Sequence, residues 1–158
     1  MARFVLDTGI LLHYVRRSLL SEFVDATHSP SKPPNIACAS IVTVAELSSL
    51  AMRLNWGAGK VERLEDLVRK IPIVEIRHGA LVSRFAEIDA YCLGRHPTMK
   101  LPTHTSSQSL GDNDIWIAAT TSVLQATLLS TDKDFLFLDK VFFDVIYIDP
   151  QSNLNVSH

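Results

Sequence analysis

Residues 3–9 constrain the fold most, because a strand-forming run, a carboxylate and a helix start follow one another there. Residues 4–6 are apolar and favour a buried strand, and Asp7 ends the run. Thr8 is a residue type that caps helices, so we expect it to begin a helix over 9–17. This order is typical of α/β proteins, in which ligands bind beyond the carboxyl ends of parallel strands. A carboxylate at that edge is unfavourable to bury unless it is paired or binds a cation, which makes Asp7 a candidate functional residue.

The same alternation of strand and helix patterns continues along the chain and predicts a mostly parallel sheet. Strands are expected at 4–6, 35–39, 72–76, 126–130 and 143–148, and helices at 9–17, 21–28, 41–54, 60–70, 79–93 and from about 112 to 124. Ser40 is the expected N-cap of the helix that follows it. The segment 95–110 is rich in Pro, Thr, Ser and His and is expected to be a long loop, a kind of segment that is often functional or mobile.

Length and composition indicate one globular domain with an ordinary core. The chain has 158 residues, of which 47% are hydrophobic and 20% charged. We expect one domain over 1–150 and a flexible tail over 151–158. No apolar run approaches the roughly 18 residues that a membrane span needs, and the N-terminus does not resemble a signal peptide, so we expect a cytoplasmic protein that does not bind membranes. Cys38 and Cys92 lie in apolar segments and are expected as buried thiols.

Four acidic residues are expected at one edge of the predicted sheet. Asp7 and Asp132 follow strands directly, while Glu46 and Asp114 lie early in helices that begin at the same edge. Such carboxylates repel one another, and a bound Mg²⁺ or Mn²⁺ would relieve the repulsion because hard cations take oxygen ligands. A metal of this kind can position water for attack on a phosphate group. The net charge of −2 excludes a broad basic field but not an enzyme with an acidic centre.

Each of these acids also has a purely structural interpretation. A capping role is open for Asp7, Asp112, Asn113 and Asp114, a turn role for Asp132 and Asp134, and simple solvent exposure for Glu46. The triplet 7–9 matches that of aspartic proteases, but it occurs once and leads into a helix. The shared position of the acids, rather than any single one, favours the metal interpretation.

Four ordered motifs make the chain resemble the PIN-domain ribonucleases of the toxin type, the VapC-like proteins. The motifs are residues 4–8, 43–47, 113–119 and 129–135. The resemblance implies a three-layer α/β/α fold with a central, mostly parallel sheet of about five strands, and a single PIN-like nuclease domain over 1–150. It also implies Mg²⁺- or Mn²⁺-dependent cleavage of RNA, by a homodimer held by a cognate antitoxin.

The resemblance carries roles to particular residues by position. It implies catalytic and metal-binding roles for Asp7, Glu46, Asp114 and Asp132, supporting roles for Ser130, Asn113, Asp112 and Thr8, and RNA-phosphate contacts for Arg16, Arg17, Lys100 and Lys133. Asp114 is preferred to Asp112 as the metal ligand because it keeps the spacing to residues 117–119. Gly9 is a departure, since Ser or Asn is commoner at this position.

The sequence therefore predicts a metal-dependent endoribonuclease that hydrolyses RNA phosphodiester bonds and is the toxin of a toxin–antitoxin pair. Two alternatives remain open. One is a non-catalytic PIN-like module that binds RNA or protein. The other is a phosphatase that uses an aspartyl nucleophile.

Overall fold

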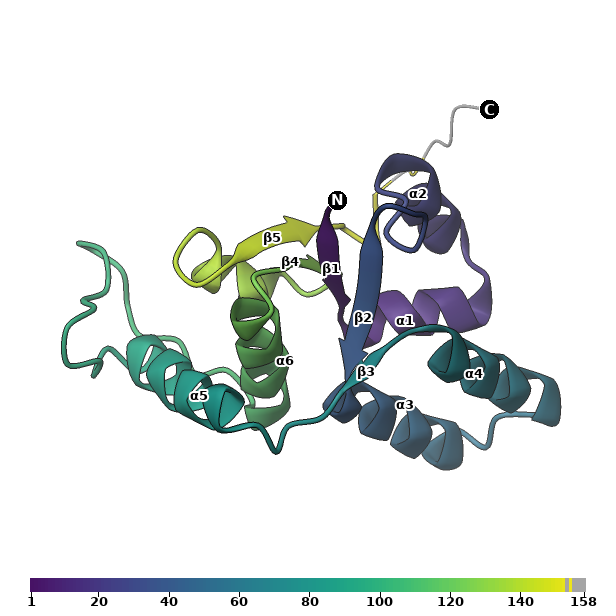
Figure 1. Cartoon of the computed structure of the whole chain (residues 1–158), viewed down its shortest axis with the longest axis horizontal. Helices are drawn as coiled ribbons and strands as arrows, with labels where there is room; N and C mark the ends of the chain where they lie inside the picture. The colour runs from purple at the N-terminus through teal and green to yellow at the C-terminus, as the bar shows by residue number, and fades with distance from the viewer. Residues whose placement is uncertain (153, 155–158) are drawn as a thin grey trace.

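The computed structural model describes residues 1–152 and 154. Five strands form one sheet, namely β1 (Arg3–Leu6), β2 (Ile36–Ser40), β3 (Ile73–Val74), β4 (Thr127–Ser130) and β5 (Asp144–Tyr147) (Figure 1). The helices in the described part are α1 (Thr8–Arg16), α2 (Leu19–Thr27), α3 (Ile41–Arg53), α4 (Ala58–Lys70), α5 (Gly79–Cys92), α6 (Asp112–Val123) and the 3₁₀ helix η1 (Lys133–Leu138).

All five strands are parallel and lie in the order β3-β2-β1-β4-β5, which confirms the predicted sheet. The first strand of the chain is therefore the central one. Its successor in sequence, β2, lies on one side, and β4 lies on the other with Leu6 opposite Leu129. Both faces of β1 are covered, which explains its uninterrupted apolar run.

Helices cover both faces of the sheet, as the α/β/α expectation requires (Figure 1). Val5 of β1 points into a core cluster with α5 and α6, whereas Phe4 and Leu6 point into a second cluster with α1, α2, α3 and α4. This alternation follows from the two-residue period of a strand. Cys38 and Cys92 are buried free thiols, as predicted.

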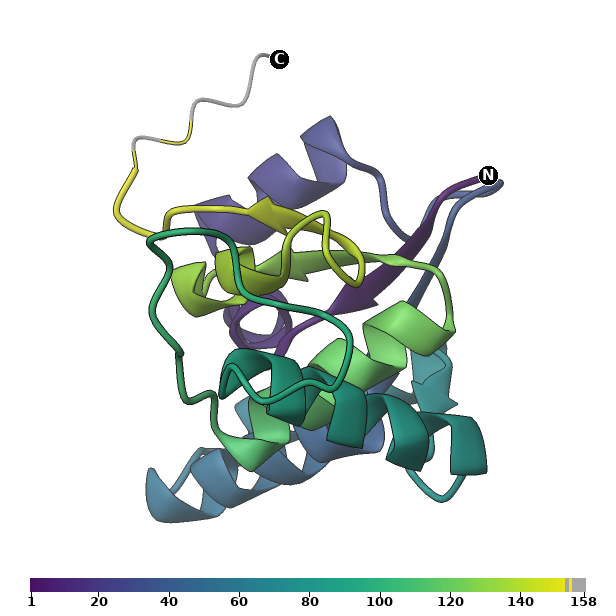
Figure 2. The ribbon, with the colours of Figure 1, turned by 90° about the vertical axis from the view of Figure 1, so that its left-hand side faces the viewer.

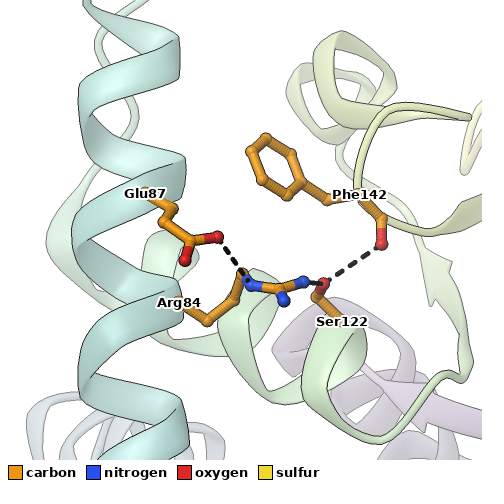
Figure 3. Close-up of polar contacts among 4 residues, drawn as sticks. All are labelled: Arg84, Glu87, Ser122 and Phe142. Carbon is orange, nitrogen blue, oxygen red and sulfur yellow. Dashed lines mark hydrogen bonds and ion pairs between the residues drawn. The ribbon is translucent and has the colours of Figure 1, made fainter. Parts of the chain in front are cut away.

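A polar contact joins α5 to α6 and to the segment before β5 (Figure 3). The Arg84 guanidinium pairs with Glu87 on its own helix at 3.1 Å and donates to the Ser122 hydroxyl. Ser122 in turn donates to the Phe142 carbonyl at 3.1 Å. The contact fixes the helix pair that packs on one face of the sheet.

The N-terminal caps of two helices differ from those predicted from the sequence. The N-cap of α1 is Asp7 and not Thr8, because the Asp7 carboxylate accepts from the Ile10 N–H at 2.9 Å. The N-cap of α6 is Gly111, without a side-chain cap, so the capping interpretation of Asp112, Asn113 and Asp114 is wrong. Ser40 caps α3 as predicted.

Other boundaries differ by a few residues. Strand β3 has two residues instead of the expected five, and η1 was not expected. No helix or strand occurs between the end of α5 and the start of α6, where the long loop was predicted (Figure 2). Of the predicted tail, residues 153 and 155–158 lie outside the described part, and Leu154 is half-buried against the second cluster. None of the described helices has the length and apolar character of a membrane span.

Candidate active site at the carboxyl edge of the sheet

The strand order places the topological switch point of the sheet between β1 and β4. The chain leaves β1 toward β2 on one side, and β4 occupies the other side, so the connections diverge at this point. In open α/β sheets such a switch point is where ligands bind. Asp7 follows β1 there, and its backbone N–H donates to the Leu129 carbonyl of β4 at 3.1 Å, which sets it beside Ser130.

Asp7 is a buried carboxylate, only 4% exposed. One oxygen accepts from the Ile10 N–H, and the other accepts from the Ser130 hydroxyl. Burial raises the pKa of Asp7 to about 6, the two hydrogen bonds oppose the rise, and the charges of Asp132 and Asp114 add to it. The local fold therefore holds this carboxylate in place but does not neutralise it.

Asp114 lies in the first turn of α6 and is half-buried. Burial raises its pKa to about 6, and the charges of Asp132, Glu46 and Asp134 contribute. Among the described residues, no hydrogen bond or ion pair engages its carboxylate. Glu46, in the second turn of α3, accepts from the Thr8 hydroxyl at 2.7 Å.

Asp132 has two roles in this arrangement. Its carboxylate accepts from the Asp134 N–H at 2.9 Å and caps η1, which agrees with the turn interpretation. Its backbone N–H donates to the Ser130 hydroxyl oxygen at 2.9 Å. Ser130, with no exposed surface, thus connects Asp7 to the segment that carries Asp132.

Asp7 lies within range of the charges of Asp132 and Asp114, and Asp114 lies within range of the charges of Asp132 and Glu46. Some of the other predicted residues lie apart from these acids. Asp112 and Asn113 are exposed beside Asp114, and Lys133 is exposed directly after Asp132. Lys100 lies in the long loop, and Arg16 and Arg17 lie at the far end of α1, roughly 12 Å along its axis from Thr8. None of these four cations lowers the pKa of Asp7 or Asp114.

Sequence reasoning missed two features of the site. Asp134 adds its charge to that felt by Asp114, and its position two residues after Asp132 was the available signal. Gly9 is explained by close approach, because a Cβ at this position would lie 2.1 Å from the Thr131 hydroxyl oxygen. Any larger side chain at this position would require Thr131 to move.

The donor set fits a hard divalent cation. The carboxylates of Asp7, Glu46, Asp114 and Asp132 supply oxygen atoms, and two of them have pKa values that an added positive charge would lower. Within residues 1–152 and 154, no three Asp, Glu, His or Cys side chains already converge closely enough to hold a metal ion. Binding would therefore require the side chains to move inward or to coordinate through water.

The fold and this edge together define an α/β protein with an acidic centre at the switch point of its sheet. The PIN domain profile matches residues 4–141, and the chain belongs to the PIN domain family. The search of curated protein sequences returned no match.

Solved toxin–antitoxin structures share the fold. They include VapBC2 from Rickettsia felis bound to a promoter DNA fragment (14% identity, TM-score 0.68, covering 93% of this chain and 99% of that chain). VapBC-1 from nontypeable Haemophilus influenzae has 18% identity and a TM-score of 0.68, covering 92% and 97% of the two chains. FitAcB from Neisseria gonorrhoeae has 23% identity and a TM-score of 0.65, covering 90% and 95%. These neighbours confirm the predicted resemblance to toxins of VapBC systems at the level of fold.

Proposed function

We propose that this protein is a metal-dependent endoribonuclease and the toxin of a toxin–antitoxin pair. The observation that carries the proposal is a set of four carboxylates from four separate segments at the switch point of the sheet, in which Asp7 and Asp114 both feel the charge of Asp132 and Asp114 also feels that of Glu46. PIN domains are typically nucleases. Repulsion among these carboxylates destabilises the metal-free protein. Such an arrangement is expected at a site that binds a cation and a phosphodiester substrate.

Asp7 and Asp114 would be the main ligands of Mg²⁺ or Mn²⁺, with Glu46 and Asp132 completing the site directly or through water. When bound, such an ion supplies positive charge that orients a water molecule and stabilises the charge that develops on phosphate. Ser130 holds the Asp7 carboxylate by a hydrogen bond, and Thr8 does the same for Glu46. These two hydroxyls position the acids and need not touch the substrate.

A groove between α3 and α4 supports the proposal that an antitoxin binds this protein. Its volume is about 610 Å³ and its lining is mainly apolar, with Met52 at its rim 83% exposed. The Trp56 indole Nε1 beside it is buried without a hydrogen-bond acceptor among the described residues. An amphipathic antitoxin segment would cover the apolar surface. A homodimer remains part of the proposal.

RNA cleavage tests the enzymatic proposal directly. Purified protein should cleave RNA when Mg²⁺ or Mn²⁺ is added, and Asp7→Asn and Asp114→Asn should abolish cleavage while circular dichroism shows an unchanged fold. Asp144→Asn is the matched control, because Asp144 is exposed at the amino end of β5, away from the carboxyl edge.

Two results would redirect the proposal. RNA binding without metal-dependent cleavage would favour the non-catalytic module, although such a module has no evident need for four repelling acids. Hydrolysis of a small phosphate ester, with RNA left intact, would favour the aspartyl phosphatase.

A further inference from the structure

A second groove opens directly beside the acidic site. It has a volume of about 370 Å³ and is lined by Val42, Ala45, Glu46, Ser49, Arg53 and Asn113. The α3 residues among them recur at spacings of three and four and so share one face of that helix. Asn113, in the first turn of α6, forms part of the opposite wall. The groove therefore leads from Glu46 along α3 toward Arg53.

Arg53 is the cation of this groove. It is exposed in the last turn of α3, and none of the described residues forms an ion pair or hydrogen bond with its side chain. It lies seven positions after Glu46, a distance of roughly 10 Å along the helix axis. Favourable interaction with the carboxyl end of the helix accounts for a cation in the last turn, but not for its place in the groove that also contains Glu46.

Charge explains why a cation in this groove matters. The groups that shift the pKa values of Asp7 and Asp114 by charge are all acids, so the centre itself repels a polyanion. A nucleic-acid strand that reaches such a centre needs cations close by to hold its backbone. Arg53 lies in the groove next to the centre, whereas Arg16 and Arg17 lie at the far end of α1.

We propose that the groove from Glu46 to Arg53 is the path of the single-stranded RNA backbone and that Arg53 binds a flanking phosphate. This inference rests on the proposed ribonuclease function and names its substrate contact. A separation of roughly 10 Å along α3 places this phosphate a few nucleotides at most from the cleaved bond. The guanidinium geometry suits two phosphate oxygens, and the groove walls keep the strand beside the acids. Arg53 is a positioning residue and not part of the chemistry.

The binding test uses an inactive background, Asp114→Asn, and a fluorescein-labelled single-stranded RNA of about twelve nucleotides and mixed sequence. Fluorescence anisotropy over a series of salt concentrations gives the affinity and its salt dependence. Adding Arg53→Gln should weaken binding about three- to tenfold and reduce the slope of log affinity against log salt by about 0.7, the value for one lost phosphate contact. Arg53→Lys should keep the slope, and Arg3→Gln, at the amino end of β1, should leave binding unchanged.

Cleavage by the otherwise wild-type protein supplies a second readout. Arg53→Gln should raise KM by a similar factor and leave kcat nearly unchanged, because the contact is lost equally from the bound substrate and the transition state. Equal KM and equal salt slope in Arg53→Gln, with RNA still cleaved by the wild type, would overturn this inference and leave the ribonuclease proposal standing.

Two other outcomes would also overturn it. If the wild type does not cleave RNA and the inactive background does not bind RNA, both proposals fail together. If Arg53→Gln leaves RNA binding intact but converts a dimer into monomers by light scattering, the groove is an interface between copies of this chain.

Discussion

Replacing Asp7 with asparagine is expected to stabilise the metal-free protein. Burial and neighbouring acids raise the pKa of Asp7 from 3.8 to about 6. At neutral pH the native state must therefore hold this group ionised against its environment, which lowers stability by about 3 kcal/mol relative to a neutral group. Asparagine is neutral and of the same shape, and its oxygen can still accept from the Ile10 N–H. The variant should recover most of that free energy.

The pH dependence gives this prediction its sign. Because the folded-state pKa is raised, the wild type keeps its full stability only below about pH 4 and loses it as the pH rises through 6. The advantage of Asp7→Asn should therefore be about 3 kcal/mol at about pH 7.5 and should shrink as the pH falls, to less than about 1 kcal/mol near pH 4. For a chain of this size the gain near neutral pH corresponds to a rise in Tm of roughly 6–12 °C.

Thermal and urea unfolding in the presence of a chelator measure these differences. Asp149→Asn is the control, since the exposed Asp149 also accepts a backbone N–H, from Gln151 at 2.9 Å, and its substitution should change stability by less than about 0.5 kcal/mol. Added Mg²⁺ should stabilise the wild type more than Asp7→Asn, because the ion binds the native carboxylates. A variant no more stable than the wild type near pH 7.5, with the control unchanged, would refute the claim that Asp7 destabilises the fold.

Two further substitutions examine the contacts around Asp7. Ser130→Ala removes a hydrogen bond that lowers the pKa of Asp7, so this pKa should rise above about 6. A ¹³C NMR titration of the Asp7 carboxyl carbon measures it. An unchanged or lower pKa would contradict the assigned contact. Gly9→Ala should lower the free energy of unfolding in urea by about 1–3 kcal/mol, because the new Cβ meets the Thr131 hydroxyl. Adding Thr131→Ala should restore part of the loss. A Gly9→Ala protein as stable as the wild type would disprove the close approach.

The architecture could be predicted from the sequence because it depends on periodicity. Two-residue and 3.6-residue apolar patterns identified the five strands and the six α-helices, and their alternation required parallel neighbours. Parallel order then placed residues 7, 46, 114 and 132 at one edge without any knowledge of distances. These inferences needed only residue types and the handedness of the connections.

The details of the site depend on desolvation and on backbone geometry, which residue types alone do not specify. Asp7 caps α1 because its backbone is extended, with φ −74° and ψ 174°, while Thr8 is already helical and its hydroxyl reaches Glu46 instead. Gly111 begins α6 without a side-chain cap, which leaves Asp114 without a local partner. The near-complete burial of Asp7 likewise results from packing across the sheet.

The central position of β1 has a consequence for synthesis. Strand β1 is flanked by β2 on one side, but its other neighbour, β4, comes from residues 127–130, much later in the sequence. Until that segment leaves the ribosome, β1 has an open edge, and the acidic centre lacks both Ser130 and Asp132. A nascent or truncated chain without this segment would thus be unable to assemble the acidic centre, so any activity that the centre has would begin only after β4 and Asp132 have been made.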